Sequence, residues 1–362
     1  MLSSEVKEYI AENIKSRVIP GLSLLVARGD DILIDEVFGY KSLIPQKIEL
    51  ERDAIYDLAS LTKPLITALL IAIAVKEKKI KLSTEVKEIF RGFPYSININ
   101  NLLTHTSGLP AWYPFYLFED DIMFQIKRLP LSSKPGKRVN YSCIGYILLS
   151  KILEDIYQLP FKNIVKKIII ERLDLKNTFF GEVPNNKIDG CVPTELGNKF
   201  EKNMADDDKK FKKLSEKFNW RKNLIIGEIN DANAFYLEGN SGNAGLFSTA
   251  KDILEISNEF YPHSTNLLSP EITRFFWENR TLFKKSHRTV GFKLNSSIIT
   301  SGGRGISRKA IGHNGFTGVS LWLEPKTEYK FIILTNRIHP EVKPLPFNKV
   351  RRKLHKLIKK ML

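Results

Sequence analysis

A serine and a lysine three residues apart, in Ser60-Leu61-Thr62-Lys63, form the first candidate for chemistry. They follow an extended segment and open a long apolar helix, on which positions i and i+3 share one face. The free amides and the positive end of the helix dipole favour an alkoxide at Ser60. A lysine among Ile and Leu neighbours can accept the serine proton. The segments 4–7 and 248–251 have the same spacing but not this context, so we predict Ser60 as nucleophile and Lys63 as its base.

Two further motifs offer groups that could serve the same reaction. Tyr141 follows the Pro135-Gly136 turn at the head of an apolar helix, where a phenol beside cations can shuttle a proton. His313-Asn314-Gly315 ends a predicted strand, and Gly315 allows a ligand to approach the backbone closely. The amide of Phe316 can then donate to an oxyanion. A buried core tyrosine and an ordinary strand-end turn remain the structural alternatives for these two motifs.

Several other catalytic signatures are missing from the sequence. The segment 239–243 lacks the last glycine of a G-x-S-x-G elbow, and no P-loop or G-x-G-x-x-G is present. This argues against α/β-hydrolases, nucleotidases and dehydrogenases. There is no CxxC, HxH or HExxH pattern, so we predict no metal and no cofactor.

The elements that must position these residues form a clear order along the chain. The sequence pattern predicts a β-hairpin at 21–40 and a short extended segment at 55–59. Helical patterns dominate the middle (60–79, 142–159, 161–173 and 250–260), with a polar surface insertion at 197–222. Three strands follow at 310–313, 318–323 and 329–335. Residues 1–20 and 348–362 predict amphipathic terminal helices.

This order predicts an α/β fold of the α+β type. The first two and last three strands would form one antiparallel five-stranded sheet, with the terminal helices on one face and a separate helical lobe beside it. We therefore expect a discontinuous sheet lobe, 1–58 with 290–362, and a helical lobe, 59–289. The catalytic cleft would lie between them.

Composition narrows the class of protein and its partners. The chain has 362 residues, a net charge of +16 and only two cysteines, which excludes a disulfide scaffold. Its longest apolar run, 64–75, is shorter than the roughly 20 residues that span a membrane, and no signal peptide is evident. We therefore expect a soluble, cytoplasmic protein. Its lysines are scattered, so no nucleic-acid partner is expected, although the basic helix 348–362 could associate weakly with an anionic surface.

Taken together and in this order, the motifs resemble one family: the serine β-lactamase and penicillin-binding-protein-like hydrolases. The branch is that of class C β-lactamases, D-alanyl-D-alanine carboxypeptidases and family VIII esterases. The resemblance covers about residues 18–345. Further blocks that resemble the family lie at 20–21, 102–110, 193–195, 230–234, 244–250 and 334–340.

The resemblance implies a β-lactamase/transpeptidase-like fold and an acyl-enzyme mechanism. Ser60 would attack a carbonyl, Lys63 and Tyr141 would share proton transfer, and the Ser60 and Phe316 amides would form the oxyanion hole. His313 stands where the family often has lysine and would orient the carboxylate or leaving group of the substrate, with Asn314 and Gly315 beside it.

One departure from the family pattern bears on the substrate. Cys143 replaces the asparagine that commonly contacts an acylamide, and a thiol is a poor donor, which disfavours an efficient β-lactamase. The implied function is a serine hydrolase acting on a small ester, amide or β-lactam-like substrate. A D-alanyl-D-alanine carboxypeptidase or penicillin-binding protein, and a non-catalytic ligand-binding member of the fold, remain open.

Overall fold

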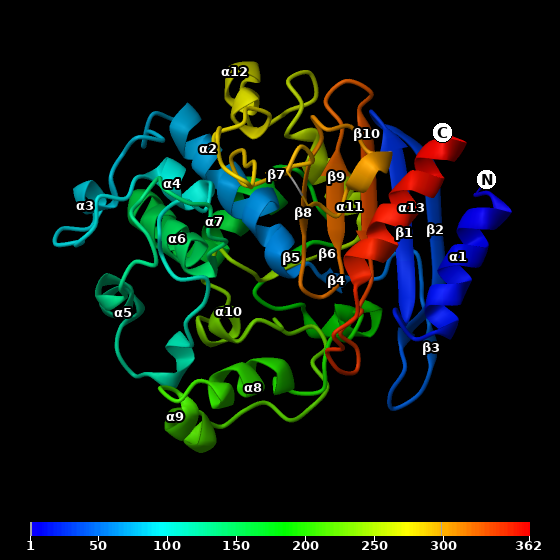
Figure 1. Ribbon diagram of the computed structural model, residues 1–362, viewed down its shortest axis with the longest axis horizontal. Helices are drawn as coiled ribbons and strands as arrows, with labels where there is room; N and C mark the ends of the chain where they lie inside the picture. Colours follow the sequence, from blue (N-terminus) through cyan, green and yellow to red (C-terminus); the bar gives the residue numbers. More distant parts are fainter. Residues whose placement is uncertain (1, 298) are drawn as a thin grey trace.

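A seven-stranded antiparallel sheet forms the centre of the protein in the computed structural model, which describes residues 2–297 and 299–362 (Figure 1). The strand order is β3-β2-β1-β10-β9-β8-β7. The strands are β1 (Gly21–Arg28), β2 (Asp31–Ser42), β3 (Ile48–Glu49), β7 (Lys293–Leu294), β8 (Ile311–Asn314), β9 (Ser320–Leu323) and β10 (Tyr329–Leu334). The five predicted strands are present, but the predicted number was wrong. The two additional strands, β3 and β7, are edge strands of two residues each, too short to show a period in the sequence.

The first and last parts of the chain meet in the middle of this sheet. Strand β1 pairs with β10, with Leu24 opposite Ile333. Because side chains alternate along a strand, Leu24 and Val26 enter one hydrophobic cluster while Leu25 and Ala27 enter another. The middle of the sheet is therefore buried on both faces.

The two terminal helices cover one face of the sheet, as predicted. Helix α1 (Ser4–Lys15) buries Val6 and Ile10, and α13 (Phe347–Met361) buries an apolar stripe that includes Leu354 and Ile358. The helices lie side by side at the right of Figure 1. The other face packs on α11 (Ala250–Asn258) and on the large core.

The segment 60–79, predicted as one helix, consists of three consecutive helical segments of different types. A 3₁₀ turn (Ala59–Leu61) leads into a π-helical segment (Lys63–Ala68) and then into α2 (Leu69–Lys76). Among the described residues, Ala59–Lys76 is the one helix apolar and long enough to cross a membrane, and 83% of it is buried inside the protein. Its apolar side chains are accounted for by core packing.

The remaining helices surround this buried segment. They are α3 (Val86–Ile89), α4 (Ile99–Leu103), α5 (Ile122–Arg128), α6 (Cys143–Tyr157), α7 (Phe161–Val165), α8 (Lys199–Asp207), α9 (Lys212–Lys217), α10 (Ala232–Tyr236) and α12 (Pro270–Thr273). Helix α6 matches the prediction for 142–159, and the helix predicted at 161–173 divides into α7 and a π-helical turn, Lys166–Ile170. The insertion 197–222 forms α8 and α9, which pack on a separate aromatic cluster.

A second small sheet, not predicted, holds the segment just before Ser60. It has the order β4-β6-β5, from Tyr56–Asp57, Leu246–Ser248 and Phe179–Phe180. The largest hydrophobic cluster contains residues of both predicted lobes, such as Leu25 and Ile332 from the large sheet and Leu65 and Ile147 from the helices. The lobe boundaries therefore stay a prediction.

Candidate active site

Ser60 and Lys63 lie in direct contact at the start of the buried helical segment. Lys63 Nζ donates to Ser60 Oγ at 2.8 Å and to the carbonyl oxygen of Asn243 at 2.8 Å. The lysine is fully buried, while Ser60 is half-buried and faces a cleft. The ammonium also lies 5.2 Å from the ring centre of Tyr141. The three residues expected to share the proton chemistry are therefore one cluster.

The protonation of this cluster is set by burial and by mutual contact. Burial raises the pKa of Tyr141, while the Lys63 charge and the hydroxyl of Ser60 act in the opposite direction. Burial disfavours the ammonium of Lys63, but its neighbours Cys143 and Tyr141 outweigh this, and the pKa of Lys63 is raised. At neutral pH both groups hold their protons in the resting state. The form that accepts the serine proton is then a minor species.

The backbone just before the nucleophile is held by Asp57 of β4. The carboxylate of Asp57 accepts from the amide of Ala59 at 2.7 Å and from the amide of Asn230 at 2.8 Å. Ala59 has a φ of 45°, a left-handed conformation that a residue with a side chain rarely adopts. These two hydrogen bonds support that conformation and so fix where Ser60 points.

The loop after β8 is fastened to the same segment. Thr317 Oγ1 donates to the carbonyl of Asp57 at 2.8 Å. A Cβ added at Gly315 would lie 2.5 Å from the carbonyl oxygen of Leu58, so only glycine fits this approach. Among the described residues, the amide of Phe316 has no backbone acceptor. It is therefore free to donate into the cleft beside Ser60, as an oxyanion hole requires.

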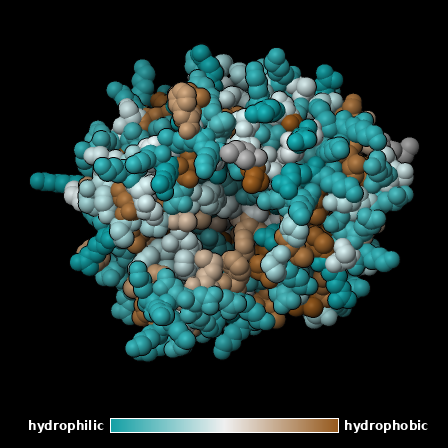
Figure 2. Space-filling view, viewed as in Figure 1, coloured by the Kyte–Doolittle hydropathy of each residue, from teal (hydrophilic) through white to brown (hydrophobic). Residues whose placement is uncertain are grey.

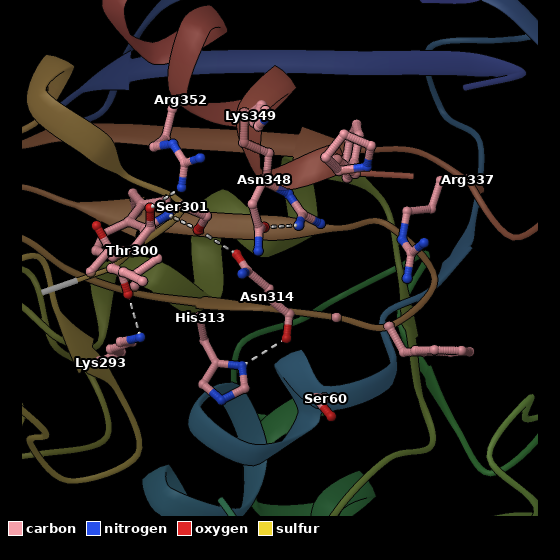
Figure 3. Close-up of a pocket in the computed structure, with 18 of the residues that line it drawn as sticks. Ser60, Lys293, Thr300, Ser301, His313, Asn314, Arg337, Asn348, Lys349 and Arg352 are labelled. Carbon is pink, nitrogen blue, oxygen red and sulfur yellow. Dashed lines mark hydrogen bonds between the residues drawn. The ribbon is translucent and has the colours of Figure 1, made fainter. Parts of the chain in front are cut away.

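His313 lies in the same cleft and is held as a neutral ring. Its Nδ1 is 2.8 Å from the carbonyl oxygen of Asn314, which can only accept, so Nδ1 carries the proton and Nε2 is left as an acceptor (Figure 3). Burial, then the charges of Arg288 and Lys63, lower the pKa of His313 well below its usual value. A neutral acceptor suits a protonated leaving group better than a substrate carboxylate.

Tyr141 is oriented by the residues around the start of α6. The side chain of Ser142 caps this helix by accepting from the amide of Gly145, and its own amide donates to Nδ1 of His105 at 3.1 Å. The rings of His105 and Tyr141 pack with their centres 4.5 Å apart. Cys143 is half-buried next to Lys63, so the residue expected to replace the family's asparagine does lie at the site.

The cleft beside Ser60 has a volume of about 780 Å³ and holds Tyr141 and the segment 313–316 along its wall. Figure 2 shows a hollow near the centre of the face seen in Figure 1, with pale, tan and brown atoms at its edge and a mostly hydrophilic surface farther out. Its lining includes a set of cations that the sequence did not single out: Arg288, Lys293, Arg337, Lys349, Arg351 and Arg352. They come from loops, from β7 and from the start of α13, and no local motif marks them. The one signal in the sequence was the basic character of the C-terminal helix.

Within residues 2–297 and 299–362, no three His, Cys, Asp or Glu side chains are grouped so as to hold a metal ion. The structure brings together all eight residues named from the sequence. Six of them line the cleft: Ser60, Tyr141, His313, Asn314, Gly315 and Phe316. The other two, Lys63 and Cys143, lie directly behind Ser60.

Comparison with known proteins gives one consistent family. The β-lactamase family model matches residues 6–353. The chain is 28% identical over 370 residues to a putative D-alanyl-D-alanine carboxypeptidase of Salmonella typhi, covering 91% of this chain and 82% of that protein.

Solved structures agree on the fold. An octameric penicillin-binding protein homologue from Pyrococcus abyssi superposes with a TM-score of 0.72 at 20% identity, over 98% of this chain and 76% of that one. EstCE1, a hydrolase with promiscuous acyltransferase activity, superposes with a TM-score of 0.72 at 18% identity, over 97% of each chain.

Proposed function

The chain belongs to the β-lactamase family, and we propose that it is a serine hydrolase that cleaves small esters or amides through an acyl-enzyme at Ser60. The observation that carries this proposal is the 2.8 Å hydrogen bond from Lys63 Nζ to Ser60 Oγ, opposite the free amide of Phe316. A nucleophile, a proton acceptor and an oxyanion donor converge on one point of the cleft.

The proposed reaction has two stages. Ser60 Oγ bonds to the substrate carbonyl carbon while its proton passes to the pair of Lys63 and Tyr141. The carbonyl oxygen becomes an oxyanion that accepts from the amides of Ser60 and Phe316. The bond to the leaving group breaks, the leaving group takes the proton back, and the acyl-enzyme remains. Water then attacks the ester and releases the acid and free Ser60.

Two features of the site support small esters over β-lactams. The thiol of Cys143 offers a weak donor where an acylamide would be held. His313 is neutral and presents an acceptor, so it matches the hydroxyl of an alcohol leaving group better than the carboxylate that β-lactams carry.

The second candidate is a D-alanyl-D-alanine carboxypeptidase, the activity named for the Salmonella typhi relative. The observation that favours it is Arg288, a buried cation beside Tyr141 that lines the cleft and could bind a terminal carboxylate.

The deciding experiment is mass spectrometry of the intact protein after incubation with a fluorophosphonate or, separately, a fluorescent penicillin, followed by peptide mapping. We expect an adduct on Ser60 that is lost in Ser60→Ala. Of the two other Ser-x-x-Lys segments, the one at 4–7 begins with an exposed serine, and Ser4→Ala provides the matched control that should label normally.

The pattern of labelling separates the candidates. Fluorophosphonate labelling alone supports an esterase-like site, and labelling by both reagents supports a penicillin-recognising enzyme. No adduct from either reagent would overturn the proposal and leave the non-catalytic ligand-binding alternative.

A further inference from the structure

The cleft beside Ser60 has an unbalanced charge. Six cationic side chains line it, and no Asp or Glu does so among the described residues. They belong to four separate parts of the fold: the loop before β7, β7 itself, the exit of β10, and the first turns of α13 (Figure 3). Like charges gathered without a counter-charge repel one another, so this arrangement points to an anionic ligand.

Arg288 is the most telling member of the set. It is only 7% exposed, and its Nε is buried without a hydrogen-bond partner. Within the described residues its guanidinium forms no ion pair and no hydrogen bond; its nearest marked contact is the ring of Tyr141, 5.7 Å away. Buried charges in proteins are normally paired, so an unpaired one facing a cleft indicates that the partner is the ligand.

The start of helix α13 makes a second, independent contribution. Pro346 precedes the helix, no side chain caps its free amides, and its first turn contains no acidic residue. Residues 346–349 line the cleft, and Lys349 and Arg352 extend from this end of the helix. Cations beside the positive end of a helix dipole are unfavourable, and a bound anion relieves both charges at once.

Neighbouring cations also weaken one another's hold on their protons. Burial, assisted by the charge of Arg288, lowers the pKa of Lys293 to about 8. Burial and Arg337 lower the pKa of Arg351 to about 9, although Arg351 is held by the carbonyls of Gly318 and Val319. Both shifts have the direction that burial and neighbouring like charges produce.

We propose that the cationic part of the cleft binds a phosphate group carried by the substrate, so that the enzyme hydrolyses phosphate-bearing esters. This inference rests on the proposed function and names its substrate class. Ser60 breaks the acyl carbon–oxygen bond of the substrate and releases the alcohol, and water then releases the acid from Ser60. The phosphate stays on its original fragment.

Phosphate fits this site better than a single carboxylate. A carboxylate is planar and is satisfied by one guanidinium fork. A phosphate is tetrahedral, carries up to two charges and accepts from several directions, which matches donors that approach from a loop, a strand exit and a helix start. Asn348 also lines this part of the cleft; its Oδ1 accepts from Arg351, so its amide nitrogen remains as a donor.

The binding step can be tested without catalysis. Calorimetry on the Ser60→Ala protein, at constant ionic strength, would compare inorganic phosphate, pyrophosphate, acetate and citrate. We expect pyrophosphate to bind at least ten-fold more tightly than acetate or citrate. Arg352→Gln should weaken pyrophosphate at least five-fold. Lys356→Gln, the same charge change on the exposed side of α13, should leave it unaltered.

Three results would overturn the inference. These are the absence of millimolar pyrophosphate binding, citrate or acetate binding as tightly as pyrophosphate, and equal effects of the Arg352 and Lys356 substitutions.

A second comparison connects the subsite with turnover. We expect kcat/KM for 1-acetylglycerol 3-phosphate to exceed that for 1-acetylglycerol at least ten-fold, and the preference to shrink as sodium chloride is added. Equal hydrolysis of both esters without pyrophosphate binding would contradict the phosphate subsite but not the proposed hydrolase function. Pyrophosphate binding with no hydrolysis of either ester and no Ser60 adduct would support the phosphate subsite and contradict the proposed hydrolase function.

Discussion

Tyr141 is the residue on which the proposed proton transfer depends most. Two cations lie near its ring, Lys63 at 5.2 Å and Arg288 at 5.7 Å from the ring centre. Cations over an aromatic face stabilise the phenolate form that must accept a proton, while burial opposes it. Both effects act on the same phenol.

Removing the hydroxyl of Tyr141 should therefore slow acylation without unfolding the protein. We expect Tyr141→Phe to lower the single-turnover acylation rate on an activated ester by about 10²–10⁴-fold, the usual value of general acid–base catalysis. The control is Tyr157→Phe on the same helix, whose hydroxyl bonds Glu77 far from the cleft. A fully active Tyr141→Phe enzyme would remove the role assigned to this tyrosine.

Cys143 gives a prediction about substrate preference. Cys143→Asn restores a donor and an acceptor beside Lys63, so kcat/KM for an acylamide substrate should rise relative to that for a simple ester. We expect a gain of about ten-fold, equivalent to one hydrogen bond of about 1.4 kcal/mol. Cys143→Ser, which offers only a hydroxyl, is the comparison. An unchanged ratio in both variants would show that this position does not contact the acyl group.

The residues that sequence reasoning found and missed differ in how they are encoded. Ser60, Lys63 and His313 belong to local motifs whose spacing already carries the geometry. Arg288 and Arg352 are 64 positions apart in the sequence and line one cleft only because the loop before β7 and the start of α13 both border it. A single sequence contains no local signal for such a meeting.

At the scale of elements, the site depends on a seam between β8 and the segment after β4. Thr317, Gly315 and Leu58 form this seam, and it keeps the Phe316 amide at a fixed place relative to Ser60. The sequence revealed β8, the buried helix and the extended segment 55–59 that contains β4, but not β5, β6 or the small sheet that they form with β4. Two- and three-residue strands have no period to detect, and their pairing is decided by long-range contacts.

Forcing a side chain into this seam should damage activity more than stability. A Cβ at Gly315 would press on the carbonyl of Leu58, and the loop must move away from Ser60 to relieve the contact. We expect Gly315→Ala to cost about 1–3 kcal/mol of unfolding free energy and to reduce kcat/KM at least 100-fold. Urea unfolding and ester kinetics on one preparation would measure both.

The matched control for this substitution is Gly190→Ala. Its added Cβ meets only the side chain of Ile55 at an ordinary 3.7 Å. Near wild-type activity in Gly315→Ala would show that the approach of the two segments does not set the oxyanion hole.

For the whole molecule, buried histidines link stability to pH. Burial lowers the pKa of His105, His313, His339 and His355, the last to about 4. His355 lies on α13, with Nδ1 3.2 Å from the carbonyl of Ser301 and its ring against Phe331. A histidine whose folded pKa is depressed adds stability above its unfolded pKa of about 6.5, and that stability is lost as pH falls toward the folded value. Asp57, whose pKa burial raises to about 6, acts in the opposite direction.

The contribution of His355 can be isolated by difference. Between pH 7 and pH 5 it should account for about 2 kcal/mol of lost unfolding free energy. In His355→Gln the fall from pH 7 to pH 5 should therefore be smaller by about that amount, whatever the variant's stability at pH 7. Urea denaturation at the two pH values provides the measurement. An equal fall in both proteins would contradict this assignment.

The basic residues of α13, which contribute to the net charge of +16, lie in two different places. Arg351 and Arg352 of α13 belong to the cleft, whereas Lys353, Lys356 and Lys360 lie exposed on the same helix. Association of this exposed lysine face with an anionic surface stays a prediction. It would be tested by co-sedimentation with vesicles containing phosphatidylserine, where binding should fall steeply as salt is added.

The pairing of β1 with β10 also shapes how the protein is made. Residue 24 finds residue 333 only after almost the whole chain has left the ribosome. At 5–20 residues per second, the N-terminal hairpin waits about 15–60 s with an open hydrogen-bonding edge. During that interval the hairpin is a target for chaperones and for edge-to-edge aggregation. A nascent chain stalled before residue 329 should therefore be held in an unfinished state, and release of the last strand and helix should complete sheet and cleft together.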